Sequence, residues 1–169
     1  PAPVAGGHNG PLPTDVIGVL PFGGTLEYLE SEFYNRGVGP AELIPASDQE
    51  SFQTIQKHEN DHVAALKTFI TQRGATPGAK PNFDFTAKGN VPGFNFSVGQ
   101  YATFQVLSQA FEDTGVRAYK GQVGRLMNDK HAPKAGTSSH AVAERHATEN
   151  RRLRGKTGSV SGRRRDALT

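Results

Sequence analysis

Glu59 and His62 have the residue types and the spacing of metal ligands. Two residues three apart on a helix project from the same side. Apolar residues recur at helical intervals on roughly that side, namely Phe52, Ile55, Val63, Leu66, Phe69 and Ile70. An acid and an imidazole within an apolar stripe are unfavourable unless they are paired or bind a cation. Glu-x-x-His is also the pattern by which helix bundles hold two metal ions in their interior.

Two further segments offer inward-facing acids. Glu27, Glu30 and Tyr34 share one helix face, beside an apolar stripe, and we interpret Glu27 as a terminal ligand, Tyr34 as a hydrogen-bond donor behind the ligands and Glu30 as an additional candidate ligand. The alternative is that these acids are ordinary solvated residues. Glu112 lies in line with apolar residues and with Gly115, whose missing side chain would let a facing helix or ligand approach closely. Glu112 is therefore predicted to complete the site.

The segment around His146 is the weakest part of this pattern. A symmetric site requires a second Glu-x-x-His, but the residue three before His146 is Ala143. Glu144 is only two before it, so the two side chains point about 200° apart. Glu149 shares a face with His146 in the reversed order. We retain His146 as a candidate ligand and Glu144 and Glu149 as weaker candidates, and the site is then incomplete, asymmetric or lost.

The same residues also spell a complete H-E-x-x-H motif, from His58 to His62. In zinc peptidases of that type both histidines bind zinc and the glutamate is the general base. A zinc metallopeptidase is thus a distant alternative. No third ligand follows at a recognisable spacing, and no segment has the pattern of a substrate-aligning strand.

The elements that position these residues are four helices, and the sequence contains no convincing strand pattern. Gly and Pro at high density between residues 15 and 24 oppose a helix, so the first helix is expected from Thr25. Ser47 and Glu50 predict a capping box for the second helix, and Gly74 predicts its end. The remaining helices are expected at 97–127 and 138–154. A long crossover is expected over 74–97, fastened to the helices by Phe83, Phe85, Phe94 and Phe96. This predicts an all-α fold of three parts: an extended arm (1–24), a four-helix bundle (25–154) and a basic tail (155–169).

Composition limits the remaining functions. The chain has 169 residues and no cysteine, which excludes disulfides, thiolate metal sites and a cysteine nucleophile. No apolar run is long enough to span a bilayer. Residues 145–169 hold eight basic and two acidic residues, so we expect this tail to extend into solvent or to contact an anionic surface or a neighbouring subunit. A start at Pro1 predicts a chain processed for export, although an engineered start would look the same.

Several segments resemble the ferritin-like domain of desiccation-related and stress-related secreted proteins. The resemblance covers about residues 25 to 150, and it is carried by Leu26–Tyr34, Ile55–Leu66, Pro81–Phe85, Ala110–Tyr119 and Ala143–Ala147. It implies a ferritin-like four-helix bundle with a crossover between its second and third helices, and export from the cell. It also places Glu27, Glu59, His62 and Glu112 on ligand positions. The chain departs from the family in two places. Residues 18–24 contain Pro and Gly where relatives continue as a helix, and Ala143 stands where relatives usually carry Glu.

Two hypotheses follow. In the first, the protein binds iron or manganese at a di-metal centre and oxidises Fe(II) or disposes of peroxide. In the second, it binds no metal and has a structural or protective role outside the cytoplasm, with self-assembly into a homo-oligomer through its arms. The interrupted fourth-helix motif and the basic tail favour the second hypothesis, whereas the Glu-x-x-His pair favours the first.

Overall fold

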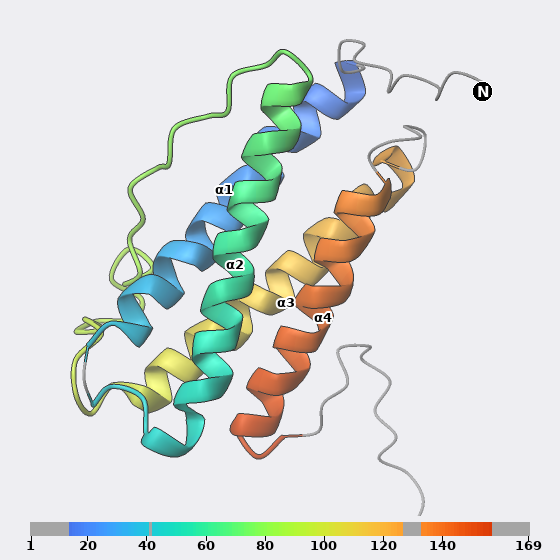
Figure 1. Cartoon of the computed structure of the whole chain (residues 1–169). Helices are drawn as coiled ribbons and strands as arrows, with labels where there is room; N and C mark the ends of the chain where they lie inside the picture. Colours follow the sequence, from blue (N-terminus) through green and yellow to red (C-terminus); the bar gives the residue numbers. More distant parts are fainter. Residues whose placement is uncertain (1–13, 41, 127–132, 157–169) are drawn as a thin grey trace, which may run out of the picture.

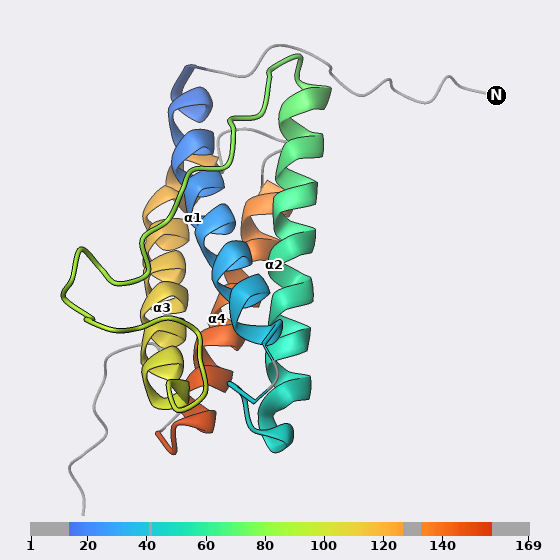
Figure 2. The same cartoon turned by 90° about the vertical axis from the view of Figure 1, so that its left-hand side faces the viewer.

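The computed structural model of the chain describes residues 14–40, 42–126 and 133–156, and in these residues the protein is a bundle of four α-helices (Figures 1 and 2). The helices are α1 (Thr14–Val38), α2 (Ala46–Gln72), α3 (Tyr101–Leu126) and α4 (Pro133–Leu153). α1 packs mainly on α2, and α3 mainly on α4, so the bundle consists of two helical hairpins. The predicted all-α fold is confirmed.

The first helix begins at Thr14 rather than at Thr25, so the prediction of an extended arm through residue 24 is wrong for this stretch. Gly24 itself lies at a close contact with α2, because it is buried and a Cβ there would lie 3.3 Å from Leu66 Cδ2. Close packing between helices outweighs the weak local propensity of glycine. The rest of the arm, residues 1–13, and the tail from residue 157 lie outside the described residues, and the division into three parts remains a prediction.

The ends of α2 test two further predictions. Its N-cap is Pro45, without a side-chain cap, and Ser47 Oγ instead donates to Asp48 Oδ1 at 3.0 Å, so the predicted capping box is wrong. The predicted stop at Gly74 is confirmed. Gly74 has φ 74°, and the amide of Ala75 donates to the carbonyl of Ile70 at 3.1 Å. A left-handed residue followed by this bond is the usual capping arrangement of a helix end.

The crossover between α2 and α3 runs along the outside of the bundle, next to α1 (Figures 1 and 2). Its side chains Phe85, Phe94 and Phe96 are buried against Phe33 of α1. Phe33 also stacks on Phe104 of α3, with ring centroids 4.7 Å apart. The prediction that phenylalanines fasten the crossover to the helices is confirmed. This aromatic layer fixes the spacing of α1 and α3, from which the candidate ligands Glu27, Glu30 and Glu112 project.

No helix within the described ranges is long and apolar enough to cross a membrane.

Candidate metal centre

All four helices contribute to one buried group of acids and imidazoles, which we call the Glu–His cluster: Glu27, Glu59, His62, Glu112 and His146. Glu27 comes from α1, Glu59 and His62 from α2, Glu112 from α3 and His146 from α4. The three glutamates are at most 2% exposed, and the His62 side chain is the most exposed member at 14%. The sequence predicted that Glu27, Glu59, His62 and Glu112 would converge, and in the structure they do. His146, the weaker candidate, also joins them.

Glu59 lies at the centre of the cluster because it belongs to two sets of three residues whose ligand atoms lie within 4.8 Å of one another. One set is Glu27, Glu59 and His62, and the other is Glu59, Glu112 and His146. The two carboxylate oxygens of Glu59 serve different sets. Oε2 is 3.1 Å from His62 Nδ1, whereas Oε1 is 2.8 Å from His146 Nδ1. This division has the form of a carboxylate that bridges two positions.

Some polar atoms of the cluster are buried without a hydrogen bond. Among the described residues these include Glu112 Oε2 and His146 Nδ1. His146 Nδ1 lies 2.8 Å from Glu59 Oε1 and 3.4 Å from Glu112 Oε1, at ion-pair distances, but it forms no hydrogen bond with either carboxylate. Buried polar atoms without a partner are rare and call for an explanation such as an ion or water. Ligand atoms that converge on a common point have this geometry.

The pKa values of the cluster are shifted by burial and by its mixed charges. Burial raises the pKa of Glu27 to about 7, although the contact with His62 opposes the rise. Burial acts on Glu59 in the same direction, but the contacts with His146 and His62 outweigh it and lower its pKa to about 2. Burial would lower the pKa of the imidazoles, yet their carboxylate neighbours raise it to about 10 for His62 and about 9 for His146. Without a cation, protonated imidazoles balance the carboxylates.

A hydrogen-bond network behind the cluster orients Glu112. The buried hydroxyl of Tyr34 donates to Glu112 Oε1 at 2.7 Å and lies 2.8 Å from Ser108 Oγ. Ser108 in turn donates to Asn150 Oδ1 at 2.7 Å. The predicted role of Tyr34 as a donor behind the ligands agrees with this geometry. Sequence reasoning missed Asn150, although its position four residues after His146 places it on the same face of α4.

His58 supports the cluster from outside. Its ring stacks on that of His146, with centroids 5.2 Å apart and planes 8° from parallel, and its Nδ1 lies 3.0 Å from His146 Nε2. The second nitrogen of His146 is thereby engaged, so that Nδ1 faces Glu59 and Glu112. A partner on the far nitrogen is the usual way to fix the orientation of a ligand imidazole.

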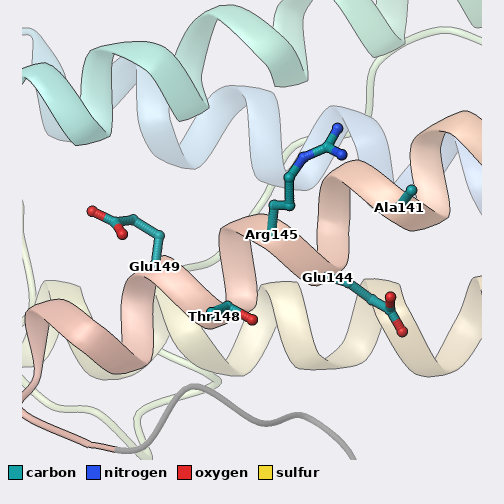
Figure 3. A pocket seen from close by; sticks show the side chains of 5 residues that line it. All are labelled: Ala141, Glu144, Arg145, Thr148 and Glu149. Atoms are coloured by element: carbon teal, nitrogen blue, oxygen red, sulfur yellow. The ribbon is translucent and has the colours of Figure 1, made fainter.

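The two weaker candidates of α4, Glu144 and Glu149, do not join the cluster. Glu144 is exposed, and Glu149 accepts a hydrogen bond from Ser51 at 2.9 Å and pairs with Arg152. Both acids line a shallow depression of about 450 Å³ on α4 (Figure 3). Figure 3 shows Glu144 and Arg145 pointing in opposite directions from the helix. The depression is an open surface feature and contains no member of the Glu–His cluster.

Comparison with known proteins agrees with this architecture. The sequence profile of the ferritin-like domain matches residues 15–156. No curated protein matches the chain. A solved structure, described as a conserved hypothetical protein, rv2844, from Mycobacterium tuberculosis, is similar with a TM-score of 0.67 and 15% identity, over 84% of this chain and 98% of that one. At this identity the likeness concerns the fold.

Proposed function

The chain belongs to the ferritin-like domain family, and from this premise we propose that it binds two divalent transition-metal ions at the Glu–His cluster. The observation that carries the proposal is the position of Glu59, whose two oxygens face different imidazoles. Glu59 would bridge the ions, Glu27 and His62 would bind one, and Glu112 and His146 would bind the other. Carboxylate and imidazole ligands favour iron or manganese.

The buried donor atoms fit such ions. Glu112 Oε2 and His146 Nδ1 have no hydrogen-bond partner in the described part of the chain, and a cation would satisfy both. Binding requires neutral imidazoles and ionised carboxylates, so it would release the protons that His62 and His146 otherwise hold. The ions would supply redox chemistry, either oxidation of Fe(II) or disposal of peroxide. The protein's own contribution is a dry, preformed set of ligands.

Metal analysis tests the proposal directly. Protein loaded anaerobically with Fe(II), or loaded with Mn(II), and then desalted should retain about two equivalents. Glu59→Gln should lose both, because it removes the shared carboxylate. Glu50→Gln is the matched control, since Glu50 is an exposed acid on the same helix. Wild-type protein that is folded and retains no ion above the level of Glu59→Gln would refute the proposal.

One feature favours a second candidate, a structural or protective protein without a metal. Ala143 is buried on α4 where a symmetric site has a carboxylate, and the site would then be a remnant. The zinc peptidase alternative fits less well, because His58 contacts the far nitrogen of His146 rather than sharing a ligand position with His62.

Membership of a secreted, desiccation-related subgroup remains a proposal from sequence resemblance, as do export and self-association. Residues 157–169, which carry much of the positive charge of the tail, lie outside the described residues. Sedimentation of the chain with and without residues 155–169 tests their role in assembly. The same number of subunits in the full chain and in the shortened chain would exclude a role of the tail in assembly.

A further inference from the structure

A fourth buried acid lies next to the Glu–His cluster but outside both of its sets of three. Glu30 follows Glu27 by one helical turn on α1 and is only 2% exposed. Its Oε1 is buried without a hydrogen-bond partner among the described residues. Burial raises the pKa of Glu30 well above its usual value, and the charges of Glu112, Glu59 and Glu27 act in the same direction. An acid in these surroundings is unfavourable unless it is protonated or bound to a cation.

The facing helix has a glycine where Glu30 approaches it. A Cβ on Gly115 would lie 2.9 Å from Glu30 Oε1, which is closer than such atoms approach one another. Gly115 follows Glu112 by three residues, so both lie on the face of α3 that is turned toward the cluster. The carboxylate of Glu30 therefore occupies space that any other residue at 115 would fill.

The side chain of Ala143 leaves α4 without a carboxylate in the same region. Ala143 is buried with Val116 and Ala147 in a small apolar group, and Val116 is the neighbour of Gly115 in the chain. Ala143, where α4 lacks an acid, and Glu30, the additional acid of α1, thus lie next to two neighbouring residues of α3, Val116 and Gly115. With Glu30 included, the interior holds four carboxylates in the described part of the chain, and two divalent ions would balance their charge.

We propose that Glu30 is a metal ligand that replaces the carboxylate α4 lacks at Ala143, with Gly115 as the residue that makes room for it. This inference rests on the proposed function. α1 would then provide two of the ligands, Glu27 and Glu30, in addition to those from the other helices. The site would be complete rather than a remnant.

The test compares metal stoichiometry and affinity, measured by calorimetric titration of the metal-free chain with Mn(II), in wild type and Glu30→Gln. The variant keeps the shape of the side chain and removes its charge. We expect it to retain one tight equivalent, with the second weakened at least about 10-fold. Moving the carboxylate to α4, in Glu30→Ala combined with Ala143→Glu, should restore the second equivalent. Glu50→Gln is again the control, and circular dichroism checks the fold.

Gly115→Ala provides a second measurement that leaves every acid in place. The added methyl group should displace Glu30 and weaken the second equivalent alone. Two tight equivalents in folded Glu30→Gln, or in Gly115→Ala, would overturn the inference while leaving the proposed function intact. Failure of wild type to bind any Mn(II) or Fe(II) would instead remove both. If Glu30→Gln does not fold, the Gly115→Ala result decides.

Discussion

The interior of the bundle has an aromatic half and a carboxylate half, and they are stabilised in different ways. In the aromatic half, Phe33 contacts rings from α1, α3 and the crossover, and burial alone is favourable. In the carboxylate half, charged and polar groups are buried beside a small apolar group, and their burial is unfavourable until protons or cations balance the charge. Tyr34 joins the halves, with its ring against Phe33 and its hydroxyl on Glu112. The aromatic half is thus stabilised by burial itself, whereas the stability of the carboxylate half depends on bound protons or cations.

The largest expected effect comes from removing the centre of the aromatic half. Phe33→Ala should lower the free energy of unfolding by about 3–5 kcal/mol, because the ring is fully buried and its loss leaves a cavity. Urea denaturation of the metal-free protein measures this loss. A loss below about 1 kcal/mol would show that the two halves are not stabilised differently.

The stability of the metal-free protein should fall as the pH rises from 5 to 9. The pKa values of Glu27, His62 and His146 are raised in the folded state, to about 7, 10 and 9. Their contribution is therefore complete below the unfolded pKa values and is lost as the pH rises through the folded ones. Glu59 has a lowered pKa, so its contribution is lost only below about pH 4.5.

For Glu27 alone, the free energy of unfolding should fall by about 3 kcal/mol as the pH rises through its folded pKa. Denaturation at pH 5, 7 and 9 tests the trend, and Glu27→Gln should reduce it. With metal ions present, stability should instead rise with pH, since the ions displace the protons held by Glu27, His62 and His146. A free energy of unfolding that rises with pH in the metal-free protein would contradict this account of the carboxylate half.

Tyr34→Phe should affect the boundary between the halves more mildly. The ring remains, but Glu112 and Ser108 lose a hydrogen-bond partner, which costs about 1–2 kcal/mol of stability. Metal affinity should also fall, by about 10-fold. Tyr28→Phe is the matched control, because the hydroxyl of this tyrosine on the same helix donates to the exposed carbonyl of Gly78. Equal losses of stability and of metal affinity in the two variants would show that Tyr34 does not support the metal site.

The smallest expected effect concerns the outer surface of the crossover. Lys80 of the crossover pairs with Glu32 of α1 at 2.5 Å, and its side chain is 52% exposed. Lys80→Ala should change the free energy of unfolding by no more than about 1 kcal/mol, because exposed ion pairs contribute little. A larger loss in urea denaturation would mean that charges, rather than the aromatic half, fasten the crossover.

The sequence predicted the parts of the fold and site that depend on short spacings. Glu59 and His62 are three apart, and their helical face follows from that spacing. The long crossover follows from the repeated Gly, Pro and Asn after Gly74, and its attachment to the helices follows from the phenylalanines within it. Each of these features is decided within one or two helical turns.

Features that depend on contacts between distant segments could not be predicted in this way. α1 begins at Thr14 although Gly and Pro between residues 15 and 24 indicated the opposite, and Gly24 of this stretch packs on Leu66 of α2. The contact of His58 with His146 joins helices that are distant in sequence. The closeness of Glu30 to Gly115 depends on how α1 crosses α3. Local propensity carries no information on any of these distances.

The two hairpins each carry only part of the Glu–His cluster. α1 and α2 provide Glu27, Glu59 and His62, whereas α3 and α4 provide Glu112 and His146. Contacts inside a hairpin are close in sequence and form quickly, but docking the hairpins must close the long crossover. An ion shared between Glu59 and His146 would join the hairpins across their interface, so it should slow their separation and lengthen the lifetime of the folded protein.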